Sequence, residues 1–453
     1  MTHPDAPGAV RWIVRTLEEA GFESWAVGGA VRDALAGRPS GDWDLTTRAT
    51  PRQVRRLFPR TVPIGVDHGT MGVLARDGTL YEVTTFRKDV ETTGRHAVVS
   101  FATTLDEDLA RRDFTINAVA WHPLRNVFHD PFEGGRDLGQ GIVRTVGPPQ
   151  ERFAEDYLRI LRALRFAGRF RFRLDGPTWT ALCAGVEQMG ILSPERVREE
   201  LEKVLSEEGR PSAALSLYAA SGALAFLYPE LHASVGERET ASPAGSDRWS
   251  QALRAVDLLP PEPVGLRMAA LLSVTGEDSH QTALATATLL TRIRSSNARV
   301  RVVGGWAAAA SAPPLPGAPD GELRRWLSAA GREGIPGALR VVAARLRAAL
   351  APLSPAERDD AVRQAARLLR RLRAESRGGA PLSVEELALT GRDLIRMGYR
   401  PGPVFGDLFR TLLDEVMENP EINQEVRLAR RALEFLDSVG VRPRGASEET
   451  DER

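Results

Sequence analysis

The sequence predicts an α/β domain at the N-terminus and an all-helical remainder. Between Val27 and about Trp121, short runs typical of strands alternate with helical runs. From about Gln150 onward, the apolar residues recur with helical spacing and strand signals are few. A length of 453 residues predicts roughly three domains. We therefore expect one α/β domain followed by helical domains.

The elements of the α/β part can be placed one by one. Residues 8–20 predict a first helix, which is charged and amphipathic. The runs 71–74 and 80–84 predict two paired strands, because the turn residues 76–78 lie between them. Residues 114–121 predict another strand.

The helical part carries its own start and stop signals. Ser193 followed by Pro194 is a typical helix start, with Ser as the N-cap and Pro at the first helical position. The alanine-rich run 307–310 is expected to be helical, and the Pro- and Gly-rich run 312–317 after it is the best linker candidate. The charged end 447–453 is expected to be disordered.

The overall charge does not single out a nucleic-acid partner. The chain has 60 basic and 60 acidic residues and therefore no formal net charge. Only two of the basic residues are lysine, Lys88 and Lys203. Arginine suits bidentate contacts to phosphates and bases, although a GC-rich genome explains such an overall bias more simply.

Cysteine usage and hydropathy exclude several classes of protein. The single cysteine, Cys183, rules out an internal disulfide framework and a Cys-based zinc cluster. Residues 1–20 lack the apolar core of a signal peptide. No apolar run approaches 18 residues, so we expect no membrane span and a cytoplasmic location.

The most informative segment begins with a glycine pair. Residues 27–33 read VGGAVRD. Gly28 and Gly29 lack a Cβ atom, so their backbone N–H groups can approach a phosphate closely. The helix expected to follow them adds a dipole that favours an anion at its N-terminus.

Two aspartates follow this glycine pair. Residues 42–44 read DWD, and the segment from 41 to 47 is expected to be a turn that enters a strand. On a strand, Asp42 and Asp44 share one face and Trp43 points the other way, into the core. Two carboxylates on one face can hold Mg²⁺ beside a triphosphate. A bare Asp pair is more often a hydrated surface turn, but the glycine pair and arginine before it favour a functional site, and together they resemble the nucleotidyltransferase superfamily typified by DNA polymerase β.

A second polar segment, residues 111–118, reads RRDFTINA. Arg112 offers a forked, permanently charged set of donors for triphosphate oxygens. Asp113 and Asn117 are candidates for orienting this arginine or a ribose. Taken alone, the segment is more simply a charged helix end that leads into a buried strand.

A third segment, residues 155–166, reads EDYLRILRALRF. Asp156 and Arg159 are expected at i, i+3 on one helical face, where they could form an ordinary ion pair. They could also read a base, because an Asp acceptor beside an Arg donor matches cytosine and adenine. Uracil and guanine present the reverse pattern and would leave buried polar groups unpaired. Arg162 and Arg165 continue the row and are candidates for phosphate contacts.

Two further assignments stay open. Glu82 lies on the strand expected at 80–84 and is either a third carboxylate of the site or an exposed strand residue. The stretch from 88 to 100, which contains Gly94, Arg95 and His96, is a candidate mobile loop over the site.

In order, these motifs resemble class II tRNA nucleotidyltransferases, the bacterial CCA-adding enzymes and their poly(A) polymerase relatives. The matching segments are GGAVRDALAG with DWDLTT, EDLARRDFTINAVA, HDPFEGGRDLGQGIVRTVG and ERFAEDYLRILRALRF. The resemblance is strong over about residues 22–205. It is weaker beyond them, where the run 399–406 is similar to the tRNA-binding tail of the family.

The resemblance implies a fold and a domain order. The α/β part would be a nucleotidyltransferase head with a polymerase-β-like mixed sheet and helices, and the remainder would be an all-α neck, body and tail. The expected ranges are a catalytic head at 1–143, a nucleotide-selecting neck at 144–206, a helical body at 207–375, a tRNA-binding tail at 376–440 and a disordered C-terminus at 441–453.

The resemblance also implies site residues. Asp42 and Asp44 would be catalytic and would bind the Mg²⁺ ions. The residues expected to bind the nucleotide are Gly28, Gly29, Arg32, Arg112, Asp113, Asn117, Asp156, Arg159, Arg162 and Arg165. Among these, Gly29, Arg32 and Arg112 would hold the triphosphate, while Asp156 and Arg159 would select CTP or ATP with Arg162 in support.

The implied reaction is template-independent addition of CCA to the 3′ end of tRNA, in which CTP and ATP react and pyrophosphate is released. A poly(A) polymerase, or an enzyme that adds only A or only CC, would use the same site, and the sequence does not separate them. A non-catalytic RNA-binding protein on the same scaffold is disfavoured because both aspartates are present. The sequence indicates neither the oligomeric state nor the role of residues 240–380.

Overall fold

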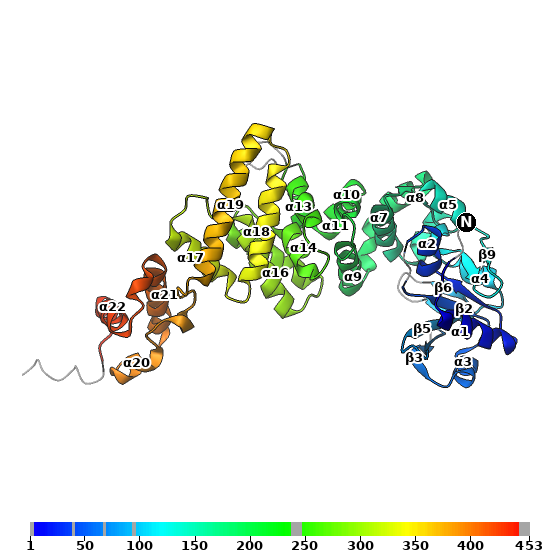
Figure 1. Ribbon diagram of the computed structural model, residues 1–453, viewed down its shortest axis with the longest axis horizontal. Helices are drawn as coiled ribbons and strands as arrows, with labels where there is room; N and C mark the ends of the chain where they lie inside the picture. Colours follow the sequence, from blue (N-terminus) through cyan, green and yellow to red (C-terminus); the bar gives the residue numbers. More distant parts are fainter. Residues whose placement is uncertain (1–3, 39–40, 67–68, 93–96, 237–246, 444–453) are drawn as a thin grey trace, which may run out of the picture. The chain divides into compact units, whose positions relative to one another are not determined.

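The computed structural model describes the whole chain except residues 1–3, 39–40, 67–68, 93–96, 237–246 and 444–453. The chain divides into two compact units, Met1–Pro229 and Glu230–Arg453. Figure 1 shows that the labelled strands belong to the first unit, whereas the described part of the second unit is helical. This confirms the predicted fold class. Among the described residues, no helix has the length and apolar character that a bilayer crossing requires.

The first unit is built on a mixed sheet. Its strands are β1 Ser24–Val27, β2 Asp44–Thr47, β3 Thr61–Gly65, β4 Thr70–Leu74, β5 Leu80–Thr85, β8 Ala120–His122 and β9 Val127–His129. Over the described residues, their order in the sheet is β3-β4-β5-β2-β1-β8-β9. Strand β2 is parallel to β5 and antiparallel to β1. Two smaller pairs are β6 Arg87–Thr92 with β7 Ala97–Phe101, and β10 Ile142–Val143 with β11 Arg173–Leu174.

Helices surround this sheet and continue after it. Those of the first unit are α1 Gly8–Glu19, α2 Gly29–Leu35, α3 Pro51–Leu57, α4 Leu105–Ala110, α5 Gly134–Gln140, α6 Pro149–Glu155, α7 Leu158–Phe170, α8 Gly176–Ala184, α9 Pro194–Leu205, α10 Ser212–Ala220 and α11 Ala223–Leu227. Two short 3₁₀ helices are η2 Thr115–Asn117 and η3 Glu187–Ile191, and α12 Pro229–His232 begins where the first unit ends.

The two faces of the main sheet are covered differently. On one face, Leu45 and Val83 pack in a core with Ile13 of α1 and Val54 of α3. The other face is apolar beside β1, where Val27 packs in a core that α4 completes. Successive strand residues point to opposite faces, so this second face carries polar residues further along, at β2 and β5. One face of the sheet is therefore covered by an apolar core, and the part of the other face at β2 and β5 is a polar surface.

The predicted elements of the α/β part agree with the structure except at 114–121. The first helix, the strand pair 71–74 and 80–84 and the helix after the glycine pair are confirmed. Residues 114–121 form the 3₁₀ turn η2 and then the short strand β8, so the prediction of one strand was wrong. The cause is local, because the Asp113 carboxylate accepts hydrogen bonds from the Phe114 N–H and from Asn117 Nδ2. Such side-chain bonds offer the backbone an alternative to a strand.

The stretch from 88 to 100 is not one loop. Strands β6 and β7 pair antiparallel across it, so its described residues are largely strand. The residues Gly94, Arg95 and His96 lie outside the described residues.

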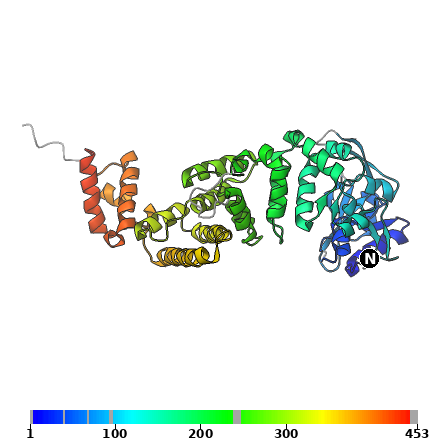
Figure 2. The same cartoon turned by 90° about the horizontal axis from the view of Figure 1, so that it is seen from above.

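The second unit is helical throughout its described part. Its elements are α13 Arg248–Asp257, α14 Val264–Leu272, α15 Ser279–Arg292, α16 Asn297–Ser311, α17 Asp320–Ala330, α18 Ile335–Leu350, α19 Pro355–Arg377, η4 Val384–Glu386, α20 Gly391–Arg396, α21 Pro403–Glu418, η5 Pro420–Ile422 and α22 Glu425–Ser438. The alanine-rich run 307–310 lies in α16, and the run 312–317 separates α16 from α17, as predicted. Figure 2 shows these helices from above.

Apolar cores hold the helices of the second unit together. One core joins α17 and α19 through Leu323, Leu368 and Leu372. Another joins α21 and α22 through Leu412 and Leu428. The predicted boundaries between head, neck, body and tail stay predictions, and residues 447–453 lie outside the described part of the chain.

Candidate active site

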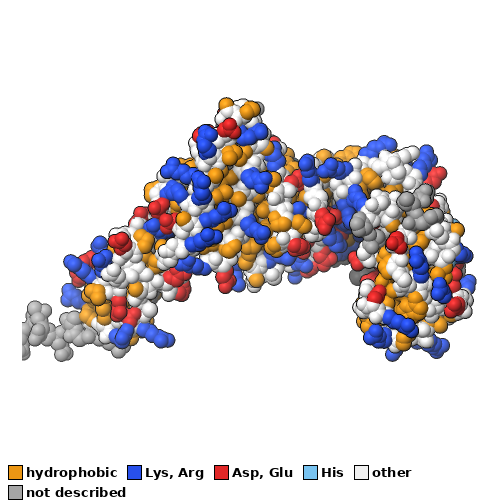
Figure 3. Space-filling view, in the orientation of Figure 1, with side chains coloured by type: hydrophobic (Ala, Val, Ile, Leu, Met, Phe, Trp, Pro, Cys, Tyr) orange, Lys and Arg blue, Asp and Glu red, His pale blue; other side chains and the backbone are white. Residues whose placement is uncertain are grey.

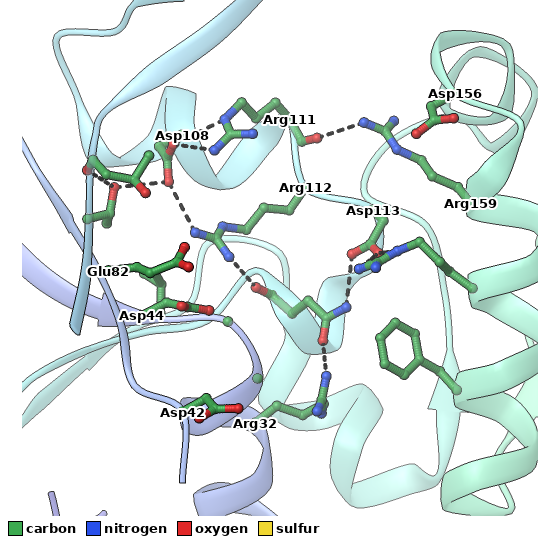
Figure 4. Close-up of a pocket in the computed structure, with 18 of the residues that line it drawn as sticks. Arg32, Asp42, Asp44, Glu82, Asp108, Arg111, Arg112, Asp113, Asp156 and Arg159 are labelled. Carbon is green, nitrogen blue, oxygen red and sulfur yellow. Dashed lines mark hydrogen bonds and ion pairs between the residues drawn. The ribbon is translucent and has the colours of Figure 1, made fainter. Parts of the chain in front are cut away.

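One pocket of the first unit brings the predicted site residues together. It has a volume of about 910 Å³. Every predicted catalytic and nucleotide-binding residue lines it: Gly28, Gly29, Arg32, Asp42, Asp44, Arg112, Asp113, Asn117, Asp156, Arg159, Arg162 and Arg165. Figure 4 shows Asp42 and Asp44 on one side, Asp156 and Arg159 across from them, and Arg111 and Arg112 between. Residues that lie up to 137 positions apart in the sequence therefore share one location.

The carboxylates are placed by strand geometry. Strand β2 begins at Asp44, so Asp42 precedes the strand, yet the expected alternation holds because Trp43 is buried in the core. Parallel β2 and β5 pair Leu45 with Val83. This register sets Asp44 beside Glu82, and Figure 4 shows both side chains together with Asp42.

The local electrostatics of this cluster favour a cation. The pKa of Asp44 is raised to about 6, first by burial in the pocket and then by the charges of Glu82 and Asp42, while Arg112 acts in the opposite direction. Neighbouring carboxylates repel one another when ionised. A bound cation would remove that repulsion.

Glycine is required at position 28 by its backbone and by its neighbours. Gly28 has a φ of 76°, which side-chain-bearing residues rarely adopt. A Cβ atom there would lie 3.3 Å from Asp44 Oδ2 and 3.4 Å from an Arg112 nitrogen. The backbone thus passes close to both a carboxylate and an arginine of the pocket.

A buried carboxylate that the sequence analysis missed anchors the two arginines of the second motif. Asp108 on α4 is fully buried and forms ion pairs with Arg111 at 2.9 Å and with Arg112 at 3.3 Å. Burial alone would raise the pKa of Asp108, but the two arginines lower it. The i, i+3 and i, i+4 spacing of these residues is the signal that could have identified the anchor.

Asn117 links three parts of the pocket. Its Oδ1 accepts a hydrogen bond from Arg32 at 2.6 Å, its Nδ2 donates to Asp113 at 2.9 Å, and its carbonyl accepts from Arg112 at 3.3 Å. Arg32 also lies over the rings of two phenylalanines of α7, Phe166 and Phe170. Arg32 therefore packs between the sheet domain and α7 while it lines the pocket.

Asp113 forms a buried ion pair with Arg162. The distance between Asp113 Oδ2 and Arg162 is 2.6 Å. Burial alone would raise the pKa of Asp113, but Arg162, Asn117 and the Phe114 N–H lower it to about 2. This pair joins the second motif to α7.

The depressed pKa of Asp113 predicts a pH-dependent contribution to stability. A folded-state pKa of about 2 against an ordinary value of 3.8 contributes about 2 kcal/mol above pH 4, which is lost as the pH falls from about 4 to about 2. We expect Asp113→Asn to lower the free energy of unfolding most at pH 6 and progressively less below pH 4. Urea unfolding of both proteins at pH 6, 4 and 3 measures this difference. A difference that stays constant over this range would contradict the assigned pKa.

The expectation that Asp156 and Arg159 share one helical face was wrong. Asp156 has φ −157° and ψ 105°, which ends α6, and α7 begins at Leu158. Its carboxylate instead accepts hydrogen bonds from the Leu158 N–H at 3.1 Å and from Arg196 at 2.7 Å. Arg196, in the first turn of the helix predicted to start at Ser193 and Pro194, is therefore a direct partner of Asp156 that the sequence analysis did not single out.

The other arginines of the third motif have specific partners. Arg159 is paired with Glu155 and donates to the Arg111 carbonyl at 3.2 Å, so it bridges α7 to the second motif. Arg165 is ion-paired at 2.8 Å with the fully buried Glu200 of α9. Arg165 therefore serves helix packing in addition to lining the pocket.

Sequence and structure comparisons agree with this geometry. Residues 24–144 match the family model of the poly A polymerase head domain, and residues 171–235 match that of the probable RNA- and SrmB-binding site of polymerase A. The chain is 42% identical over 255 residues to the CCA-adding enzyme of Geobacillus kaustophilus, and 47% identical over 195 residues to that of Anoxybacillus flavithermus. These matches cover 54% and 43% of this chain, and 62% and 49% of the two relatives.

A solved structure extends the likeness to the full length. The Bacillus stearothermophilus CCA-adding enzyme in complex with CTP aligns with a TM-score of 0.70 and 30% sequence identity, and the alignment covers 95% of this chain and 98% of that one. Because the likeness in sequence and fold spans nearly the whole of that enzyme, the chain belongs to the family of class II CCA-adding enzymes.

Proposed function

We propose that this protein adds CCA to the 3′ end of tRNA, taking the nucleotides from CTP and ATP. The observation that carries the proposal is one pocket in which Asp42 and Asp44, the arginines and the pair Asp156 and Arg159 lie together. The relatives named above are CCA-adding enzymes, one of them in complex with CTP. A poly(A) polymerase or a partial, A-adding or CC-adding enzyme is the alternative product with the same site.

The carboxylates suit Mg²⁺. Asp42, Asp44 and Glu82 offer hard oxygen donors and a surplus of negative charge at one edge of the pocket. Among the described residues, no cluster of three or more Asp, Glu, His or Cys side chains has the arrangement of a self-sufficient metal site. Mg²⁺ is commonly held by one or two carboxylates together with substrate phosphates and water. We therefore assign Asp42 and Asp44 as its protein ligands, and leave Glu82 as a neighbour that adds charge.

The reaction needs an attacking hydroxyl and a neutralised triphosphate. The 3′-hydroxyl of the RNA loses its proton to solvent as its oxygen forms a bond to the α-phosphorus, the bond from that phosphorus to the bridging oxygen breaks, and pyrophosphate leaves with the electron pair of that bond. The chemistry that Mg²⁺ supplies when bound is a lowered pKa of the hydroxyl and compensation of charge on the leaving oxygen. Arg112, fixed by Asp108 and by the Asn117 carbonyl, presents its guanidinium on the same side of the pocket as Asp44. A guanidinium held in place needs no reorganisation as charge develops.

The base would be selected across the pocket. Asp156 is held by Arg196 and the Leu158 N–H, and Arg159 by Glu155 and the Arg111 carbonyl. These contacts fix an acceptor and a donor before a nucleotide arrives. A base with the reverse pattern would set an acceptor against the Asp156 carboxylate and a donor against the Arg159 guanidinium, and such mismatches are strongly rejected.

The second unit offers a surface for the RNA backbone. Arg340, Arg347, Arg373 and Arg377 line a groove of about 560 Å³ between α18, α19 and the end of α13, and none of the described residues that line it is acidic. Figure 3 shows basic side chains gathered over α18 and α19. Arginines on one surface attract phosphates and make binding salt-dependent.

An extension assay tests the proposed function. Transcripts of tRNA that end before CCA, after C and after CC would each receive CTP, ATP or both, with Mg²⁺. We expect addition of the missing residues only, in the order C, C, A, and then a stop.

The other outcomes separate the alternatives. Addition of A to the CC-ended transcript alone, or of long A tails, would overturn full CCA addition and assign the alternative product. No incorporation into any transcript would overturn the enzymatic proposal.

A further inference from the structure

An exposed apolar surface lies on the same sheet face as the carboxylates. Val62 and Ile64 of β3 and Leu80 of β5 are 43%, 44% and 43% exposed. We call these three residues the apolar shelf. Exposed large aliphatic side chains in a group, next to a pocket, mark a binding surface more often than isolated ones do.

The strand registers place the shelf in line with the pocket. Across the sheet, Glu82 pairs with Gly72 of β4, and Gly72 pairs with Val62 of β3. Paired residues point to the same face, so Val62, Gly72, Glu82 and Asp44 share the face that opens into the pocket. Neighbouring strands are about 4.8 Å apart, so β3, which lies three strands from β2, is about 14 Å from Asp44, and Leu80 on the adjacent β5 is closer.

Because Gly72 has no side chain, the side chains of Ile64 and Leu80 on either side of it can approach each other. A Cβ atom at Gly72 would lie 2.8 Å from Ile64 Cδ1 and 2.9 Å from Leu80 Cδ1. The two side chains therefore meet across the glycine and form a continuous aliphatic surface. The pocket itself reaches β4 at Thr70, two residues before Gly72 on the same strand.

We propose that the apolar shelf supports the nucleobases that precede the 3′-terminal nucleotide of the RNA. This rests on the proposed function, which places the reacting 3′-hydroxyl at Asp42 and Asp44. A strand that leaves these carboxylates along the open sheet face meets the shelf within its last few nucleotides. Arg60, which is exposed and directly precedes β3, stands at the far end of the shelf and suits a phosphate of the same strand.

The chemistry of the shelf fits RNA ends that change during the reaction. The RNA is extended one nucleotide at a time, so different bases occupy the positions behind the 3′ end at each addition. A surface of Val, Ile and Leu contacts the flat face of any base and has no polar group that a wrong base edge would leave unpaired. In this proposal, Asp156 and Arg159 select the base of the incoming nucleotide and do not select the bases that precede it in the RNA.

The strand chemistry at the sheet edge argues against a second protein chain as the occupant. Strand β3 is an edge strand of the described sheet, and its third residue is Pro63. Proline lacks the N–H that pairing with another strand would need. The edge is thus protected from strand addition, while the face with Val62 and Ile64 remains accessible.

A double-mutant cycle between protein and RNA tests the shelf. The protein variant is Ile64→Ser with Leu80→Ser, and the RNA variant carries an abasic residue at the penultimate position of a CC-ended tRNA. We expect each change alone to lower kcat/KM for the RNA about tenfold in ATP addition. If the two groups contact each other, the combined loss should remain about tenfold, because the second change removes a contact that is already absent.

Controls separate the shelf from folding and from the proposed function. Val127→Ser, at the opposite edge strand and 45% exposed, should leave all rates unchanged. The KM for ATP in the shelf variant should also match that of the wild type, which shows that the pocket is intact. Losses that multiply to about a hundredfold, or a shelf variant that extends intact RNA normally, would overturn the shelf. A wild-type protein that extends neither RNA would overturn the proposed function and the shelf with it.

Discussion

Replacing Asp42 or Asp44 by asparagine is expected to lower nucleotide transfer on the order of a thousandfold or more, with tRNA binding nearly unchanged. Both side chains line the pocket, and each substitution removes a negative charge from the assigned Mg²⁺ site. The arginines of the second unit that we propose to contact RNA are untouched. Single-turnover extension of CC-ended tRNA measures the transfer, and filter binding of the same RNA measures the affinity.

A control variant far from the assigned site and a variant of the neighbouring Glu82 make this test more specific. Glu19→Gln removes one carboxylate from the exposed end of α1 and should retain full activity. Glu82→Gln should have an intermediate effect if Glu82 only adds charge beside Asp44, and an effect equal to Asp44→Asn if it is itself a ligand. Activity comparable to the wild type in the Asp42 or Asp44 variant would refute the metal assignment. Loss of RNA binding in parallel with transfer would indicate misfolding instead.

The sequence analysis could select residues that the structure gathers in one pocket, because the patterns that select them lie within short segments. Gly28 needs a positive φ, Asp42 and Asp44 need strand alternation around a buried Trp43, and each of these follows from neighbours in the chain. The fold class followed for the same reason, since strand and helix periodicity are local properties.

The partners of these residues could not be predicted in the same way. Asn117 binds Arg32 across 85 positions, and Asp156 binds Arg196 across 40. Such contacts depend on how α2, η2, α7 and α9 pack, which periodicity does not reveal. The break at Asp156 was missed because its carboxylate accepts a hydrogen bond from the N–H of Leu158, the first residue of α7, and this bond competes with helical continuation.

Replacing Asp156 by asparagine is expected to lower the use of ATP and CTP by roughly a hundredfold or more and to raise the relative use of GTP and UTP. The Asp156 carboxylate accepts one bond from the Leu158 N–H and one from Arg196, and Asp156 lines the pocket. An amide would place a second donor beside Arg159, where cytosine and adenine need an acceptor. The ratios of kcat/KM for ATP over GTP and for CTP over UTP, on tRNA ending in CC and in C, measure the selectivity.

A substitution of Arg196 tests whether Asp156 must be held in position in order to select the base. Arg196→Lys keeps the charge and loses the guanidinium geometry, so Asp156 should be held less firmly. We expect a smaller fall in selectivity than in Asp156→Asn, with KM for tRNA unchanged. The matched control is Arg198→Lys on the same helix, because Arg198 pairs with Glu202 and does not line the pocket. If both ratios of kcat/KM stayed at wild-type values in Asp156→Asn, base selection would have to reside elsewhere. If they fell in Arg196→Lys but not in Arg198→Lys, the orientation of Asp156 would be set by a contact between α9 and the break before α7.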